Sequence, residues 1–237
     1  MNHPLIIAMD FQDKKTADDF LRPFSGEELF LKVGMELFFR EGPAVVEAWK
    51  AMGHRIFLDI KLHDIPNTVK NAARQLASLD VDLITVHASG GIKMMESARE
   101  GIEAGTKTSE NNPDCVAVTQ LTSTTEQVMQ SELGITSSLE DTVIHYAANA
   151  KTAGLQGVVC SAMEAKAMKK TVGQDFAAVT PGIRLPDNPS DDQERIVTPA
   201  KARAMGSDGI VVGRSITAAK YPYQAYQDIQ NQWRELT

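Results

Sequence analysis

The sequence predicts a closed (β/α)8 barrel, and three observations carry this prediction. Eight short apolar runs rich in β-branched residues recur along the chain, segments with helical spacing lie between most of them, and polar residues gather where the runs end. Barrels of this class occupy roughly 200 to 250 residues as one domain, so a single domain spanning residues 1–237 accounts for the chain. A doubly wound open sheet would give similar local patterns and is the alternative fold.

Each predicted strand is a short apolar run bounded by turn-forming residues, the pattern of a strand buried on both faces of a parallel sheet. In chain order these runs are residues 5–10, 29–34, 55–62, 82–90, 115–122, 157–161, 176–183 and 208–214. The connecting segments carry apolar residues at helical spacing, which would place one stripe against the sheet. One such stripe consists of Val69, Ala72, Ala73 and Leu76. Glycines suited to C-terminal helix caps follow three of these segments, at Gly53, Gly105 and Gly154.

The composition is that of an ordinary globular protein and argues against several classes of function. The net charge of −7 and the pI near 5.3 leave no general basic surface for nucleic acid. No run approaches the roughly 18 apolar residues of a membrane span, and the N-terminus lacks the charged and apolar regions of a signal peptide. Cys115 and Cys160 lie inside apolar runs, so we expect buried thiols and no disulfide. These features predict a cytoplasmic protein.

The third predicted strand ends in an unusual group of charges, Asp59, Lys61 and Asp64. Residues two apart on a strand project to the same face, so the tips of Asp59 and Lys61 should lie close enough to pair. Asp64 falls just beyond the strand, where a loop begins. Charges beside an apolar strand are costly unless they are paired. The pattern indicates either a catalytic group or a structural ion pair between strand and helix, and alone it does not decide between them.

Polar residues lie at or just beyond the C-terminal ends of most predicted strands. They are Asp10, Lys32, Asp59, Lys61, His87, Thr122, Ser161, Arg184 and Arg214. In a barrel these strand ends converge on one mouth, where the active sites of such enzymes are built, and this distribution favours the barrel over the open sheet. We interpret His63 and His87 as structural, because no clear metal-ligand spacing accompanies them.

The last predicted strand ends in Gly213 followed by Arg214, which together suit a phosphate group. A bare backbone N–H and a guanidinium both donate hydrogen bonds to a dianion, and barrels commonly bind phosphate after strands seven and eight. The preceding segment, residues 181–198, is too polar and proline-rich for a helix or strand. It is also longer than an ordinary connection, which predicts a lid, although a surface excursion is the alternative. Arg184 and Gln193 lie within it.

Four segments of the chain together closely resemble the orotidine 5′-phosphate decarboxylase family in its shorter bacterial type. They are residues 58–69, 85–91, 180–184 and 211–215. The extended pattern D-x-K-x-x-D-I-P-N-T is specific to that family, whereas its D-x-K-x-x-D kernel also occurs in related sugar-phosphate barrels. The resemblance implies a homodimeric barrel that converts orotidine 5′-phosphate to UMP and carbon dioxide without a metal or organic cofactor.

The same resemblance implies roles for individual residues. Lys61 would be the proton donor, in an alternating charged array with Lys32 and Asp59 from its own chain. Asp64 would enter this array from the neighbouring subunit. The substrate-binding residues implied are Asp10 and Lys32 at the ribose, with Thr68 from the other subunit, Thr122 at the pyrimidine, Arg184, Gly213 and Arg214 at the phosphate, Gln193 between phosphate and base, and also Ile65 and Pro181.

Two other functions are compatible with parts of the pattern. A magnesium-dependent sugar-phosphate aldolase or decarboxylase on the same barrel would use Asp59 and Asp64 around the metal. The continuation from Ile65 to Thr68 and the long segment containing Gln193 argue against it. The second alternative is a catalytically silent nucleotide sensor, which would bind UMP and leave orotidine 5′-phosphate intact.

Overall fold

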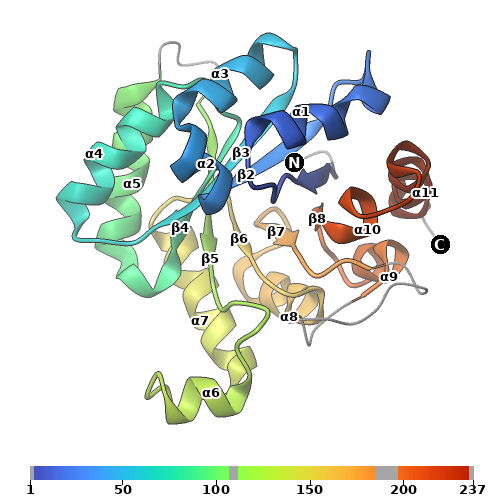
Figure 1. Ribbon diagram of the computed structural model, residues 1–237. Coiled ribbons are helices and arrows are strands. Elements are labelled where there is room, and N and C mark those ends of the chain that lie inside the picture. The colour runs from blue at the N-terminus through green and yellow to red at the C-terminus, as the bar shows by residue number, and fades with distance from the viewer. Residues whose placement is uncertain (1–2, 107–111, 185–196, 235–237) are drawn as a thin grey trace.

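A closed barrel of eight parallel strands, ordered as in the chain, forms the centre of the computed structural model (Figure 1). The structure describes residues 3–106, 112–184 and 197–234. The strands are β1 (Leu5–Ala8), β2 (Phe30–Gly34), β3 (Arg55–Leu62), β4 (Leu83–His87), β5 (Asp114–Val118), β6 (Gly157–Val159), β7 (Ala177–Thr180) and β8 (Gly209–Val212). Because β1 pairs with both β2 and β8, the sheet has no open edge, and the predicted barrel is confirmed over the open sheet.

Helices surround the barrel and connect its strands (Figure 1). They are α1 (Lys14–Leu21), η1 (Arg22–Phe24), α2 (Met35–Glu41), α3 (Pro43–Ala51), α4 (Pro66–Ala77), η2 (Ala88–Gly90), α5 (Gly91–Gly105), α6 (Glu126–Ser131), α7 (Leu139–Thr152), α8 (Ala162–Val172), α9 (Pro199–Ala204), α10 (Arg214–Thr217) and α11 (Pro222–Arg234). The predicted stripe on α4 is confirmed at Val69, Ala73 and Leu76, which are buried, whereas Ala72 is half-buried.

Six of the eight strands end earlier than the sequence predicts, whereas β2 and β3 end at the predicted residues, Gly34 and Leu62. Residues 88–90, predicted as strand, form the short helix η2. Ser161 is the N-cap of α8, and its side chain accepts a hydrogen bond from the backbone N–H of Met163. Gly213 is the N-cap of α10. The polar residues that follow the strands therefore lie on turns, which can aim their side chains into the mouth of the barrel.

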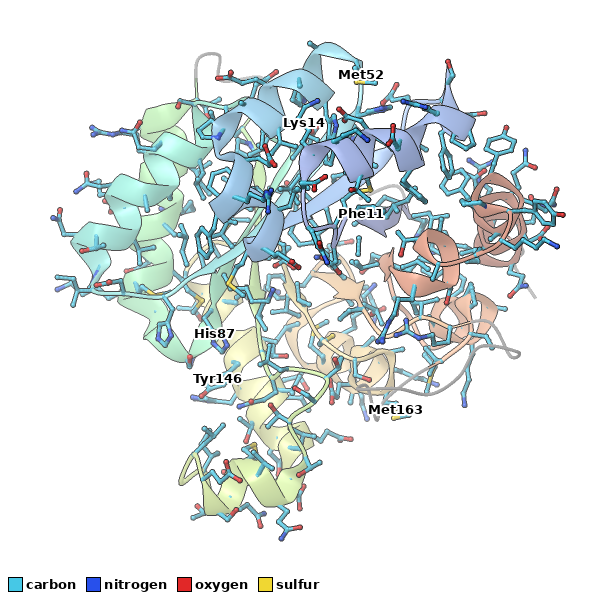
Figure 2. The ribbon with its side chains drawn as sticks, in the orientation of Figure 1. Phe11, Lys14, Met52, His87, Tyr146 and Met163 are labelled. Carbon is cyan, nitrogen blue, oxygen red and sulfur yellow. The ribbon has the colours of Figure 1, made fainter. Side chains whose placement is uncertain are left out.

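The inside of the barrel is apolar below its mouth. Its floor consists of Ile6, Ala8, Phe30, Phe57, Leu83, Val116, Val179 and Val211, with Val159 packed against them. The alternate residues of the same strands face outward and pack against the helices, whose side chains fill the outer layer (Figure 2). This alternation is the period of two expected of strands. It places Lys32, Asp59 and Lys61 on the inward face above the floor.

Helices α4 and α5 approach closely at two glycines of α5. A Cβ atom at Gly101 would lie 2.1 Å from the carbonyl oxygen of Lys70, and one at Gly105 would lie 2.1 Å from that of Arg74. The prediction that Gly105 caps its helix is therefore wrong. It is the last helical residue of α5, and its missing side chain makes room for α4.

The other two predicted caps are confirmed. Gly53 follows α3 with φ +87°, and Gly154 follows α7 with φ +80°. Such positive φ angles are the left-handed conformation in which glycine commonly ends a helix.

Both cysteines are buried thiols with no disulfide between them, as predicted. Burial, with a smaller contribution from Asp114, raises the pKa of the Cys115 thiol to about 12. Within the described ranges, no helix has the length and apolar character needed to cross a membrane.

Candidate active site

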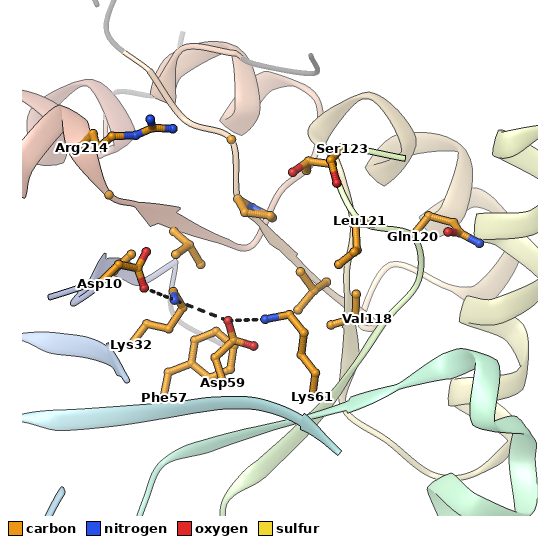
Figure 3. Close-up of a pocket in the computed structure, with 18 of the residues that line it drawn as sticks. Asp10, Lys32, Phe57, Asp59, Lys61, Val118, Gln120, Leu121, Ser123 and Arg214 are labelled. Atoms are coloured by element: carbon orange, nitrogen blue, oxygen red, sulfur yellow. Dashed lines mark hydrogen bonds and ion pairs between the residues drawn. The ribbon is translucent and has the colours of Figure 1, made fainter. Parts of the chain in front are cut away.

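A cavity of about 480 Å³ opens at the C-terminal ends of the strands (Figure 3). Most of the residues predicted from these strand ends line it: Asp10, Lys32, Asp59, Lys61, Thr122, Pro181, Arg184, Gly213 and Arg214. These residues come from β2, β3 and the turn after β1 on one side and from the turns after β5, β7 and β8 on the other. The cavity thus unites charged side chains that are more than 200 residues apart in the sequence.

Alternating charges form a continuous row along one wall of this cavity (Figure 3). Lys32 Nζ lies 3.0 Å from Asp10 Oδ1 and 3.6 Å from Asp59 Oδ2. Lys61 Nζ lies 3.0 Å from the same Asp59 Oδ2. The predicted pairing of Asp59 with Lys61 is confirmed, and Asp59 sits between two ammonium groups.

Burial differs along this row. The side chains of Lys32 and Asp59 are each 11% exposed, and that of Lys61 is 27% exposed. Burial by itself would lower the pKa of Lys32, but the neighbouring carboxylates of Asp59 and Asp10 outweigh it and raise that pKa above its ordinary value. Lys32 is therefore a permanent cation at neutral pH.

The backbone at Lys61 departs from regular strand geometry. Lys61 has φ +54°, in the left-handed region that side chains rarely adopt, and the pairing of β3 with β4 shifts register between Leu58 and Leu62. The backbone N–H of Lys61 donates to Thr85 Oγ1 at 2.8 Å, and the Thr85 hydroxyl donates to Asp59 Oδ1 at 3.0 Å. Such a bulge can redirect a side chain beside an active site.

The opposite wall of the cavity suits a phosphate group. It contains the turn after β7, with Gly182 and Arg184, and the turn after β8, with Gly213 and Arg214. Figure 3 shows Arg214 across the cavity from the charged row. The short helix α10 begins at Arg214, so glycine backbone, guanidinium and a short extra helix meet after strands seven and eight. This is the common phosphate site of barrel enzymes.

The predicted lid, residues 181–198, is described only at its two ends. The N–H of Arg184 donates to the carbonyl of Val197 at 3.0 Å, and the N–H of Val197 donates to that of Gly182 at 3.1 Å. The segment therefore leaves and re-enters the barrel at one point beside the wall that suits a phosphate group. Gln193 lies outside the described residues.

Several predicted site residues do not join the cavity of their own chain. Asp64, Ile65 and Thr68 are exposed and are not among its lining residues, and the Asp64 carboxylate accepts from the N–H of Ile65 at 2.6 Å. Ser161 is buried as a helix cap. The ring of His87 stacks on that of His63, with centroids 5.3 Å apart, and neither lines the cavity.

Sequence reasoning missed part of the site. The cavity is also lined by Phe57, Val118, Gln120, Leu121 and Ser123. Thr85 was missed too, although strand alternation gives a signal for it. Thr85 lies two residues from both Leu83 and His87 on β4, and Leu83 faces the barrel interior, so Thr85 must face inward as well.

The chemistry of the row formed by Asp10, Lys32, Asp59 and Lys61 suits an anion better than a cation. Among the described residues, no group of three or more His, Cys, Asp or Glu side chains lies close enough together to hold a metal ion. Asp59, a predicted ligand in the magnesium alternative, already faces two ammonium groups. A divalent cation at that carboxylate would be repelled by both.

The family model that matches residues 3–229 is described as "Orotidine 5'-phosphate decarboxylase / HUMPS family". The chain belongs to the orotidine 5′-phosphate decarboxylase / HUMPS family. The resemblance seen in four short motifs is thereby confirmed over almost the full length.

Curated members of the orotidine 5′-phosphate decarboxylase / HUMPS family match throughout. A protein of Bacillus cytotoxicus named orotidine 5′-phosphate decarboxylase is 54% identical over 237 residues, all of both chains. A Geobacillus protein of the same name is 55% identical over 234 residues, which cover 99% of this chain and 98% of that one.

Solved structures also match this chain over nearly its whole length. The crystal structure of orotidine 5′-phosphate decarboxylase from Lactobacillus acidophilus has a TM-score of 0.88 and 39% identity, covering 98% of this chain and 100% of that one. A conserved Geobacillus kaustophilus protein described as uncharacterized has the same TM-score, 52% identity and the same coverage.

Proposed function

We propose that this chain converts orotidine 5′-phosphate to UMP and carbon dioxide, the last step of pyrimidine synthesis, and that Lys61 is the proton donor. The observation that carries the proposal is the row of alternating charges ending at Lys61, which faces a phosphate-suited wall across one cavity. Relatives that bear the name of this activity and match over the full chain length support it.

Loss of carbon dioxide from an sp² ring carbon leaves a localised carbanion with no adjacent electron sink. The barrier is correspondingly high, and the site must lower it by on the order of 20 kcal/mol. An ammonium held beside that carbon stabilises the negative charge as it develops and then delivers a proton to it. Lys61 suits this role because its Nζ is held by Asp59 at 3.0 Å while its side chain keeps access to the cavity.

Preorganisation of the charges is the main contribution we assign to the neighbouring residues. Asp59 Oδ2 is shared by Lys61 and Lys32, so both lysines are positioned before the substrate arrives. Fixed charges of this kind need no reorganisation during the reaction, which is why they stabilise a transition state more than mobile water does. Lys32 and Asp10, which pair at the outer end of the row, would bind the ribose hydroxyls.

The phosphate would lie against Gly213, Arg214 and Arg184, with Pro181 beside it and Thr122 at the pyrimidine edge. Binding energy from a group remote from the reacting carbon can hold that carbon in place at Lys61. Gln193, which the resemblance assigns to both phosphate and base, stays a prediction.

We also propose that the enzyme is a homodimer whose two cavities each receive Asp64, Ile65 and Thr68 from the partner. These residues lie three to seven positions after Lys61, are exposed, and do not line the cavity of their own chain. Ile65 is 66% exposed, and α2, which begins at the same end of the barrel, exposes Met35 and Phe39. Apolar side chains at the rim of the mouth are what an interface between subunits would cover. A cytoplasmic setting accords with the two buried thiols.

A spectrophotometric assay of purified protein on orotidine 5′-phosphate, with and without excess EDTA, tests the activity. We expect loss of orotate absorbance at the same rate in both conditions. Strict dependence on added magnesium would instead indicate the aldolase-type chemistry of the same barrel. Binding of UMP with no turnover would indicate a nucleotide sensor.

A further inference from the structure

The β3–β4 ladder is interrupted where the catalytic lysine lies. Phe57 pairs with Leu83 and Leu58 with Ile84, but the next pair is Leu62 with Val86. Strand β3 therefore advances four residues while β4 advances two, and the extra residues bulge. Inside such a bulge, backbone groups lose their ladder partners and need others.

The side chain of Thr85 fills this gap. Its Oγ1 accepts the Lys61 N–H at 2.8 Å and lies 3.0 Å from Asp59 Oδ1, and the residue is fully buried. A backbone N–H can only donate, so the hydroxyl oxygen must accept from Lys61. The single hydroxyl proton is then left for the carboxylate of Asp59.

The hydrogen bond from Thr85 gives the two carboxylate oxygens of Asp59 different partners. Oδ1 is held by Thr85, whereas Oδ2 faces the ammonium groups of Lys61 and Lys32. A carboxylate free to rotate would not keep one oxygen on both lysines. The Thr85 hydroxyl thus orients the Asp59 carboxylate, which in turn positions the Lys61 ammonium. It also anchors the Lys61 backbone in its left-handed conformation.

We propose that Thr85 is a positioning residue for the decarboxylation, acting through Asp59 and the Lys61 backbone without touching substrate. This inference rests on the proposed role of Lys61 as proton donor. It separates two functions on one wall: Lys61 performs the chemistry, and Thr85 sets where its ammonium stands.

Thr85→Val tests the proposal, because it removes the hydroxyl and keeps the shape of the side chain. A hydrogen bond to a charged group corresponds to roughly a 10- to 100-fold effect, so we expect kcat to fall by that factor. KM and the dissociation constant of UMP should stay within about threefold, since the phosphate wall is untouched. Thr85→Ser, which keeps the hydroxyl, should restore kcat to within about fivefold of the unmodified enzyme.

Thr180→Val is the matched control. Thr180 is also fully buried on a barrel strand, and its hydroxyl pairs with that of Ser207 at 2.7 Å, away from the charged row. Thr180→Val should lower the stability of the fold about as much as Thr85→Val does, and it should leave kcat unchanged. The proposal is overturned if Thr85→Val keeps full kcat, if Thr85→Ser is as impaired as Thr85→Val, or if the Thr180→Val control loses kcat equally.

If Thr85→Val does not fold, Thr85→Cys, with its weaker donor, should have a lower kcat than Thr85→Ser, and equal values would overturn the proposal.

A crystal structure of the Thr85→Val protein separates this inference from the proposed activity. We expect the Asp59 carboxylate to rotate and its contact with Lys61 to change. An unmodified protein without decarboxylase activity would refute the proposed function, whereas unaltered geometry at Asp59 in the variant would refute the role of Thr85.

Discussion

At the scale of single residues, the site is a set of charges whose positions depend on neutral neighbours. Lys61 and Lys32 share one oxygen of Asp59, and the buried Thr85 hydroxyl holds the other. Removing a charged member therefore has two effects, because it deletes a group and also releases its partners. For this reason we expect a large loss of catalytic activity when a charged residue of the row is removed.

Lys61→Ala should reduce kcat by at least about 10⁴-fold, because in the proposed mechanism Lys61 supplies both the proton and the charge that stabilises the carbanion. UMP should still bind within about tenfold, since the wall proposed to bind the phosphate is intact. Steady-state kinetics and calorimetric titration with UMP measure the two quantities. The control is Lys15→Ala, which removes an exposed lysine paired with Asp19 at 3.2 Å. Turnover by the Lys61 variant equal to that of this control would contradict the assignment.

A second residue-scale prediction concerns His54, which is buried and accepts the N–H of Leu29 on its Nδ1 at 3.3 Å. Burial lowers its pKa below the ordinary value of 6.5, although Glu28 opposes the shift. The unfolded chain therefore takes up a proton as the pH falls through that value, while the folded protein resists it. His54 thus contributes stability above about pH 6.5, which is lost as the pH falls toward its folded pKa.

His54→Asn offers a carboxamide oxygen to the same N–H and does not titrate. Urea unfolding at pH 7.5 and pH 5.5 should show a smaller loss of stability on acidification in this variant than in the unmodified protein. Equal losses would mean that His54 is not a source of the pH dependence.

At the scale of elements, the packing of α4 on α5 positions the segment that the proposed dimer needs. Helix α4 begins at Pro66, directly after Asp64 and Ile65, so its placement decides where those two residues project. The glycines of α5 let the two helix backbones come close together. The close approach thus links a packing detail to the geometry of the mouth.

Gly101→Ala should destabilise the protein by about 1 to 3 kcal/mol, the usual range for an overpacked core. Alanine would gain up to about 1 kcal/mol in helix propensity, but its Cβ would lie 2.1 Å from the carbonyl oxygen of Lys70. A backbone atom cannot move aside as a flexible side chain does, so the clash should outweigh the gain. Urea unfolding measures it, with the exposed Glu96→Ala on the same helix as control. A more stable Gly101 variant would show that the helices separate easily.

At the scale of the whole molecule, the two ends of the barrel have different roles. At the end opposite the mouth, Asp82 accepts the N–H of Ile56 at 2.8 Å and pairs with Lys50 at 3.0 Å. Asp208 accepts the N–H of Ala178 at 2.8 Å and pairs with Lys169. These carboxylates fasten strand starts to helices, which is a structural task, whereas those of the mouth face a cavity.

Much of this arrangement could be predicted from the sequence. The eight strands follow from apolar runs, and Asp59 and Lys61 follow from strand alternation, because both depend on local periodicity. The bulge at Lys61 could not be predicted, since it depends on how β3 pairs with β4. The role of Gly105 was also hidden, because a glycine at a helix end suits a cap as well as a close contact with α4.

The proposed dimer gives a prediction at this largest scale. When Lys61→Ala and Asp64→Ala proteins are mixed and allowed to exchange subunits, each heterodimer should contain one intact site if Asp64 acts across the interface. Random exchange would restore about a quarter of the unmodified activity. The unmixed variants are the controls. No recovery after exchange verified by mass spectrometry would place each active site within a single chain.

The left-handed backbone conformation of Lys61 lowers the stability of the fold at the residue on which the proposed activity depends. Such a conformation costs on the order of 1 kcal/mol or more for a residue with a side chain, and Lys61 adopts it with φ +54°. Glycine at that position would relieve the strain but would remove the proposed proton donor. Laboratory evolution that rewards heat resistance alone should therefore discard this lysine, and only continued selection for growth without supplied uracil should retain it.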